Sequence, residues 1–178
     1  METIKPDLKK AIKAIKEGKV LVCPTDTVYG LICDAKNKKA IERLYQIKKR
    51  PKWKLLPIFV KDIKMAKGFV KINPEQEKFL KKVWPGAVTA VLEKKKSAVR
   101  IPRYKFIIDL IKRIGRPLAE SSANISDRPA STKIKEVLNQ FKGRKYHPDL
   151  VIDAGDLKKS RPSMVIDLTV LPPRTLRD

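Results

Sequence analysis

Two polar motifs carry the clearest chemical signal in this sequence. One is the cationic run Lys48–Pro51 (KKRP), and the other is Ser121–Ser126 (SSANIS), which follows the apolar residues 117–119. Arginine offers a planar fork of donors and lysine a mobile positive charge, whereas serine and asparagine side chains both donate and accept hydrogen bonds. Together these groups suit a ligand with several phosphate oxygens, a sugar and a base. This combination favours an enzyme that consumes ATP.

The positive charge of the chain is its most unusual bulk property. The 178 residues include 42 Lys and Arg against 19 Asp and Glu, which gives a net charge of +23, and 42% of the residues are hydrophobic. This length and apolar fraction predict one domain over residues 1–178, with a core of its own. A strong positive field attracts polyanions such as tRNA, other RNA or nucleotides. Because the lysines are spread along the whole chain, a merely Lys-rich solvated surface fits equally well.

Cysteine and histidine form no catalytic or metal-binding pattern in this sequence. Cys23 and Cys33 lie ten residues apart in apolar surroundings, a spacing that matches no usual zinc motif. We expect buried thiols in a reducing compartment, and we expect the single histidine, His147, in a loop. No apolar run approaches the length of a membrane span, and the N-terminus lacks a signal-peptide core. A cytoplasmic protein without a membrane partner is therefore expected.

The apolar periodicity predicts helices and strands that alternate along the chain. Helices are expected over 7–17, 38–49, 73–83, 105–114 and 132–141, and strands over 20–23, 55–60, 88–92, 98–101, 117–120, 150–153, 163–168 and 175–177, with a loop at 24–30. The interleaving predicts an α/β fold with one twisted, mixed sheet flanked by helices. In such sheets ligands bind beyond the strand ends, so we expect an open cleft there.

Six short motifs resemble, in order and spacing, those of the YrdC-like threonylcarbamoyl-AMP synthases in their short single-domain form. They are Pro-Thr-x-Thr-x-Tyr-Gly at 24–30, Lys-x-Arg-Pro at 48–51, Trp-Pro-Gly at 84–86, Val-Arg-x-Pro at 99–102, Ser-Ala-Asn-x-Ser at 122–126 and Leu-Arg at 176–177. The resemblance covers residues 20–177. Any one motif is weak, but six in the same order are specific.

The resemblance implies a nucleotidyltransferase reaction. L-threonine, bicarbonate or CO2, and ATP would give threonylcarbamoyl-AMP and pyrophosphate, the first step of the threonylcarbamoyladenosine (t6A) modification of tRNA. Mg2+ would be bound mainly through phosphate oxygens, so no protein metal site is expected. The implied partners are the downstream tRNA threonylcarbamoyltransferase machinery and, on the basic surface, tRNA or double-stranded RNA. Because the work is orientation and charge neutralisation, no covalent nucleophile is required.

The same resemblance assigns site residues to two substrates. For ATP, Lys48 and Arg50 are the catalytic pair that holds the phosphates, although Lys48 also fits an ordinary solvated lysine at a helix end. For threonine, Thr27 and Ser163 would contact the substrate and Arg100 would pair with its carboxylate, for which a bidentate fork is well suited. The complete ATP set that the resemblance implies is Lys48, Arg50, Lys54, Ser122, Asn124 and Arg177.

Two departures from the family pattern bear on the site. Asp127 stands where the family often has glycine, and Phe59 stands where some relatives have histidine. Longer relatives also add a second C-terminal domain.

Two other functions fit parts of the sequence. A non-catalytic, basic RNA-binding module agrees with the composition, and ATP binding without RNA separates it from an enzyme. A carbamoyltransferase of the hydrogenase-maturation type carries a related domain, but it also brings an acylphosphatase domain and zinc-binding cysteines that this chain does not have.

Overall fold

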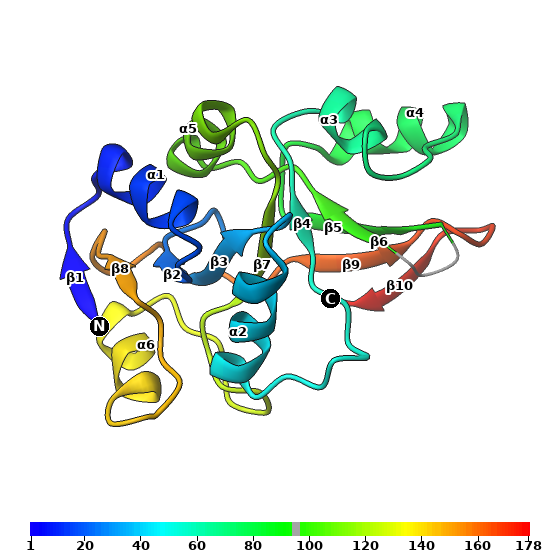
Figure 1. Cartoon of the computed structure of the whole chain (residues 1–178). Helices are drawn as coiled ribbons and strands as arrows, with labels where there is room; N and C mark the ends of the chain where they lie inside the picture. The colour runs from blue at the N-terminus through cyan, green and yellow to red at the C-terminus, as the bar shows by residue number, and fades with distance from the viewer. Residues whose placement is uncertain (94–96) are drawn as a thin grey trace.

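The computed structural model describes residues 1–93 and 97–178 and contains one mixed sheet in the strand order β1-β8-β2-β3-β7-β4-β6-β5-β9-β10 (Figure 1). Parallel and antiparallel pairs both occur in it. The α/β fold with a mixed sheet is therefore confirmed. The strands are β1 (Glu2–Ile4), β2 (Leu21–Cys23), β3 (Gly30–Asp34), β4 (Ile58–Phe59), β5 (Val88–Leu92), β6 (Ser97–Arg100), β7 (Leu118–Ser122), β8 (Leu150–Ile152), β9 (Met164–Asp167) and β10 (Arg174–Arg177).

Helices cover both faces of the sheet. In Figure 1, α1 and α5 lie above β2, β3 and β7, α2 and α6 lie below them, and α3 and α4 cover β5 and β6. Each group packs on its own apolar cluster. The helices are α1 (Leu8–Lys16), α2 (Lys38–Lys48), α3 (Ile63–Lys67), α4 (Pro74–Val83), α5 (Lys105–Ile114) and α6 (Ile134–Phe141).

Local sequence signals explain where several helices begin. Asp7, Asn37, Asp62 and Asn73 each accept a hydrogen bond from the backbone of the first turn that follows. Such N-caps satisfy donors that have no partner inside the helix and contribute about 1 kcal/mol each. The centre of the sheet, in contrast, is specified by burial, because every residue of β2 and β3 is buried.

Three elements, β1, β3 and α3, were not predicted, and one strand is shorter than predicted. β3 begins at Gly30, the last residue of the loop expected over 24–30. β1 and α3 span three and five residues, which is too short for a periodic signal. The strand expected over 55–60 contracts to Ile58–Phe59, because Pro57 cannot donate to a strand ladder. The remaining elements agree with prediction to within about two residues at each end.

The two cysteines are completely buried, as expected, and neither forms a disulfide. Burial raises the pKa of the Cys23 thiol, and it raises that of Cys33 to about 12. Since the thiolate is the reactive form, these residues serve the core rather than catalysis. No helix within residues 1–93 and 97–178 combines the length and apolarity that a membrane crossing requires.

Candidate active site

A cleft opens where the loop before β3, the segment after α2, and strands β6, β7 and β10 approach one another. Six of the nine predicted site residues line it, together with the side chain of Glu120. The predicted cleft at the strand ends therefore gathers residues that are distant in the sequence. The six predicted residues are Thr27, Arg50, Arg100, Ser122, Ser163 and Arg177.

Lys48 lies behind the cleft wall. Its side chain is 3% exposed, and Nζ donates to the carbonyl oxygen of Ser122 and to Oδ1 of Asn124, both at 2.8 Å. Two further oxygens, Ser122 Oγ and the Asn124 carbonyl, lie at 3.3 and 3.2 Å. Burial lowers the pKa of the Lys48 amine to about 7, against the opposing influence of Glu120. The alternative of a solvated helix-end lysine is therefore wrong.

Asn124 is also buried and holds the loop after β7 from inside. Its Nδ2 donates to the carbonyl oxygens of Ile125 and Arg128 at 2.9 and 2.6 Å. The backbone N–H of Ser126 donates to the carbonyl of Lys48 at 2.8 Å. Asp127, where the family often has glycine, has a φ of 66°. This left-handed conformation is one that aspartate tolerates better than most residues, so the turn survives the substitution.

Arg50 closes the segment that follows α2. Its Nε donates to the carbonyl of Lys54 at 3.1 Å, and Nη2 donates to the carbonyl of Leu55 at 2.7 Å. The Lys54 amine instead lies 5.2 Å from the ring centroid of Trp53, whose side chain is 77% exposed. Arg50 lines the cleft, whereas Lys54 is not among the residues that line it.

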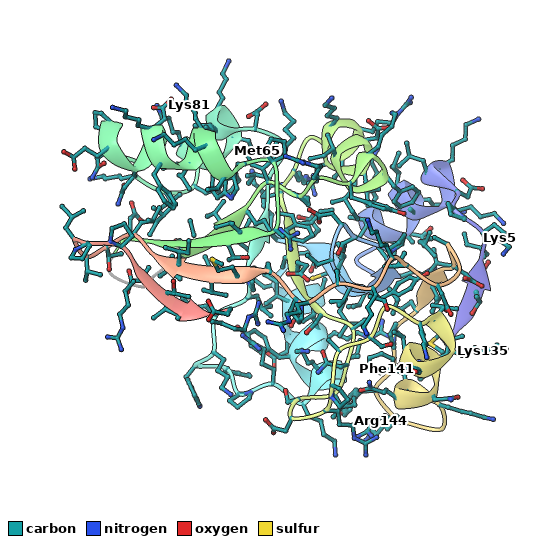
Figure 2. The ribbon with its side chains drawn as sticks, turned by 180° about the vertical axis from the view of Figure 1, so that it is seen from behind. Lys5, Met65, Lys81, Lys135, Phe141 and Arg144 are labelled. Carbon is teal, nitrogen blue, oxygen red and sulfur yellow. The ribbon has the colours of Figure 1, made fainter. Side chains whose placement is uncertain are left out.

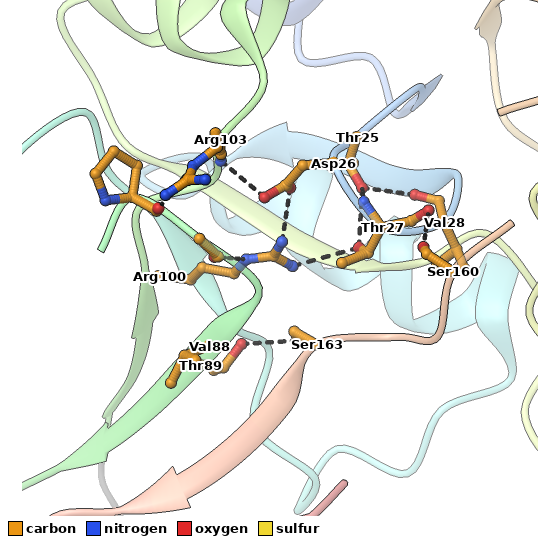
Figure 3. A network of polar contacts seen from close by, with 12 residues as sticks. Thr25, Asp26, Thr27, Val28, Val88, Thr89, Arg100, Arg103, Ser160 and Ser163 are labelled. Atoms are coloured by element: carbon orange, nitrogen blue, oxygen red, sulfur yellow. Dashed lines mark hydrogen bonds and ion pairs between the residues drawn. The ribbon is translucent and has the colours of Figure 1, made fainter. Parts of the chain in front are cut away.

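Arg100 is the most deeply buried cation of the site, with 1% of its surface exposed. Figure 3 shows its guanidinium between Asp26 and Thr27: Nη2 lies 2.6 Å from Asp26 Oδ1, and Nη1 lies 3.4 Å from Thr27 Oγ1. Nε donates to the carbonyl of Gly86 at 2.9 Å, and the group lies 5.5 Å from the centroid of the Phe59 ring. Phe59, the second departure from the family pattern, thus provides an apolar face for the arginine. Sequence reasoning did not identify Asp26.

The C-terminal strand brings Arg177 to the cleft. Its Nη2 donates to the carbonyl of Ser163 at 2.6 Å. Figure 3 shows the contact of Ser163 with Thr89, in which the two hydroxyl oxygens lie 2.9 Å apart. Ser160 Oγ donates to the carbonyl of Thr27 at 2.7 Å. These contacts tie the segment before β9 to both sides of the opening.

Glu120 is the charged cleft residue that sequence reasoning missed. Burial raises the pKa of its carboxyl group, and four cations oppose that shift, namely Arg100, Lys48, Arg177 and Arg50. It is the single carboxylate among the residues that line this cleft within the described part of the chain. A signal was present in the sequence: residues two apart on a strand share a face, so Glu120 on β7 faces the same side as Ser122.

Positively charged side chains also lie on several elements away from the cleft. Figure 2 shows Lys5, Lys81, Lys135 and Arg144 at well separated parts of its periphery. Several of the surface cations form exposed ion pairs, as Lys81 does with Glu77 at 2.8 Å, and such pairs contribute little to stability. These labelled residues do not mark one face as a polyanion-binding surface.

Comparison with known proteins identifies a family model and several proteins that are similar in sequence to this chain. The Sua5/YciO/YrdC family model, described as "telomere recombination", matches residues 13–178. The chain is 36% identical over 176 residues to the threonylcarbamoyl-AMP synthase of Pyrococcus abyssi, covering 92% of this chain and 51% of that protein. It is 34% identical to the Bacillus subtilis synthase, covering 81% and 46%. It thus spans about half the length of these two relatives.

Solved structures agree with the sequence relationship. Sua5 of P. abyssi in complex with L-threonine superposes with a TM-score of 0.86 at 32% identity, covering 99% of this chain and 56% of that one. YciO of Escherichia coli has a TM-score of 0.87 at 23% identity and covers 99% and 94%, a likeness of fold.

Proposed function

This chain belongs to the Sua5/YciO/YrdC family, and on that premise we propose that it makes L-threonylcarbamoyl-AMP from L-threonine, bicarbonate or CO2, and ATP. The observation that carries the proposal is that Arg50, Arg100 and Arg177 line one cleft together with Thr27 and Ser122, which carry hydroxyl groups. Three guanidinium groups suit a triphosphate and a carboxylate together. The enzyme would be a nucleotidyltransferase that acts in tRNA processing.

The threonine end of the cleft is the Arg100 side. The Asp26 ion pair and the Gly86 carbonyl fix the guanidinium, and Nη1 points toward Thr27. A preorganised arginine costs little reorganisation when it receives a carboxylate. Thr27 and Ser163 then offer hydroxyl groups for the rest of the amino acid. The Sua5 structure with L-threonine supports placing threonine within this fold.

The ATP end is formed by Arg50, Ser122 and Arg177. We assign the phosphates to the two arginines, because both line the cleft. Arg50 is half-buried in the segment after α2, and Arg177 is exposed on β10. Lys48 and Asn124 act in this proposal by positioning the Ser122 loop, since Lys48 Nζ already contacts four oxygens there. Lys54 contributes through its carbonyl, which Arg50 binds.

The chemistry needs orientation more than a reactive side chain. A neutral threonine amine attacks CO2, and the resulting carbamate oxygen attacks the α-phosphorus as pyrophosphate leaves. Fixed cations near the phosphates stabilise the charge that develops in that transition state. No cluster of three or more His, Cys, Asp or Glu that could hold a metal occurs among residues 1–93 and 97–178. Mg2+ would therefore arrive with the phosphates and water that it prefers as ligands.

The proposal extends to the setting in which the enzyme works. We propose a cytoplasmic enzyme that works beside the tRNA threonylcarbamoyltransferase machinery, which would consume the intermediate. The dispersed surface lysines favour weak, salt-dependent contact with tRNA rather than a dedicated RNA-binding face. A non-catalytic RNA-binding module is not favoured, because it would not require a buried arginine and hydroxyl groups around one cleft.

Pyrophosphate release from ATP and Mg2+, measured with and without L-threonine and bicarbonate, tests the proposed reaction. We expect release that requires both co-substrates, together with a product of the mass of threonylcarbamoyl-AMP. ATP binding without threonine-dependent release would contradict the assigned amino acid. Absence of ATP binding when no RNA is present would contradict the enzyme itself.

A further inference from the structure

Among the described residues that line the cleft, Glu120 is the one charged side chain to which the proposed reaction assigns no task. A carboxylate among arginines that bind anions opposes phosphate binding, because like charges placed close together repel. It is also expensive to keep there, since burial disfavours its charged form. Its place in the cleft therefore calls for a ligand group that is cationic.

Glu120 lies close enough to both proposed ends of the cleft that Arg100 and Arg50 each act on its carboxyl group. It belongs to β7, two residues before Ser122, and its backbone N–H donates to the carbonyl of Pro57 at 2.8 Å. On the other side its carboxylate lies against β3: a Cβ built on Gly30 would be 3.2 Å from Oε1 of Glu120 and 3.4 Å from Cγ2 of Thr25. The carboxylate therefore extends over the glycine that begins β3, close to the loop that carries Thr27.

The Glu120 carboxylate has no hydrogen-bond partner within residues 1–93 and 97–178. The cations around it, in contrast, form hydrogen bonds with other groups. Arg100 is bound by Asp26 and Gly86, Lys48 by Ser122 and Asn124, and Arg177 by Ser163. Each cation thus interacts with Glu120 through its field alone. Both carboxylate oxygens keep their accepting capacity for a donor that enters the cleft.

We infer that Glu120 binds the ammonium group of the amino-acid substrate while Arg100 binds its carboxylate, and that Glu120 accepts one proton from that ammonium. The inference rests on the proposed function, which supplies threonine as the substrate. An amino acid at neutral pH carries both charges, and the cleft offers the complementary pair. Glu120 is thereby a catalytic residue, because it touches the reacting nitrogen.

The proton balance of the step is simple. An N–H bond of the ammonium breaks as an O–H bond forms on Glu120, and the freed nitrogen pair makes the N–C bond to CO2. One π pair of CO2 moves onto oxygen, and a second amine proton leaves to solvent, which gives the carbamate. A carboxylate with a raised pKa is a better proton acceptor than an ordinary one. The cations that face it are those of α2, the following segment, β6 and β10, namely Lys48, Arg50, Arg100 and Arg177.

Calorimetry with two matched ligands tests the ammonium contact. The ligands are L-threonine and 2,3-dihydroxybutanoate, which replaces the amine with a hydroxyl group and keeps the carboxylate. Glu120→Gln preserves shape and removes the charge, so threonine should bind about 10- to 100-fold more weakly, as loss of a charge-assisted hydrogen bond predicts. The dihydroxy acid should bind equally well or more tightly, because the cleft becomes more positive. Glu75→Gln, a charge-matched change on exposed α4, should alter neither ligand.

Proton acceptance has its own readout. In the wild-type protein, the threonine-dependent rate should rise with pH through the titration of Glu120, and Glu120→Gln should lose that rise along with about 100-fold or more of the rate. Glu120→Asp, which keeps the charge, should retain the preference for threonine over the dihydroxy acid. Circular dichroism and a thermal melt establish that each variant is folded.

Opposite results overturn the inference separately from the proposed function. If Glu120→Gln leaves threonine binding unchanged, or weakens both ligands equally, Glu120 does not bind the ammonium. Should Glu120→Gln fail to fold, a Glu120→Asp protein without the threonine preference would decide against it. If the wild-type protein binds threonine in a Glu120-dependent way but makes no threonylcarbamoyl-AMP, the proposed reaction is wrong and the ammonium site stands. A wild-type protein that does not bind threonine overturns the ammonium site.

Discussion

The ammonium of Lys48, at the end of α2, lies 2.8 Å from Oδ1 of Asn124, in the loop after β7. This contact joins two motifs that stand more than seventy residues apart in the sequence. Because Nζ also contacts both oxygens of Ser122, the lysine fixes the loop from below. The two motifs therefore form one structural unit, in which the cation at the first motif sets the position of the hydroxyl group at the second.

Replacement of Lys48 tests this unit. Lys48→Met should lower the free energy of unfolding by about 1–3 kcal/mol, because buried oxygens of Ser122 and Asn124 lose their donor. ATP binding should weaken at the same time, since the loop is released. Urea denaturation and calorimetry measure the two effects, with Lys49→Met, an exposed neighbour, as the control. Unchanged stability with lost ATP binding would show instead that Nζ contacts phosphate directly.

Arg50 should matter for turnover far more than for folding. Arg50→Ala removes a guanidinium that is half-buried in the cleft and should cost about 2–5 kcal/mol of transition-state stabilisation, by analogy with desolvated charge pairs. Its two hydrogen bonds to the 54–55 carbonyls hold an exposed segment, so the fold should persist. Steady-state pyrophosphate release reports the loss, and Arg113→Ala in the last turn of α5 is the matched control. Near-normal turnover of the Arg50 variant would reject the phosphate role.

Arg100 should affect both threonine use and stability. Arg100→Ala should raise the threonine concentration needed for half-maximal rate more than that of ATP. Because it also leaves Asp26 without its buried partner, we expect about 3–5 kcal/mol of destabilisation.

A milder change separates the two effects of Arg100. Asp26→Asn keeps the cation and an acceptor oxygen beside it but removes the negative charge that helps to orient it, so it should raise the threonine requirement with a smaller loss of stability. Initial rates across a threonine series and a thermal melt give the comparison. An unchanged threonine requirement in Arg100→Ala would reject the carboxylate role.

The long, periodic elements were readable from the sequence, and the elements fixed by tertiary contacts were not. α5 begins and ends where its apolar period and Gly115 predict, because both signals are local. β3 carries no alternation of apolar and polar residues, since all its residues are buried. It lies inside the sheet, paired with β2 on one side and with β7 on the other. Its first residue is a glycine that packs beneath Glu120, a requirement set by a strand ninety residues away in the sequence.

The site shows the same division. The motifs identify Arg100 and Ser122 as polar groups at strand ends and Arg50 as one just after a helix, and the fold brings these residues to one cleft. Which of the other polar groups face the cleft depends on packing: Lys48 is turned inward toward the Ser122–Asn124 loop, and Lys54 lies over Trp53. No spacing rule predicts that Asp26 fixes Arg100, because the two residues approach only in the folded chain.

The titration of Glu120 should also leave a signature in folding stability. Burial raises the pKa of this carboxyl group above its ordinary 4.5, so between pH 4.5 and the folded pKa the folded protein holds a proton that the unfolded chain has released. The stabilisation that results is complete below pH 4.5 and is lost as the pH rises through the folded pKa. Glu120→Gln resembles the protonated form at every pH. Its melting temperature should therefore exceed that of the wild-type protein increasingly as the pH rises, until the difference becomes constant above the folded pKa.

Thermal melts at several pH values measure this difference in melting temperature, and Glu75→Gln should show no such trend. A wild-type protein that gains stability relative to Glu120→Gln with rising pH would mean that the four cations outweigh burial, and that the cleft stabilises the carboxylate before any ammonium ligand arrives.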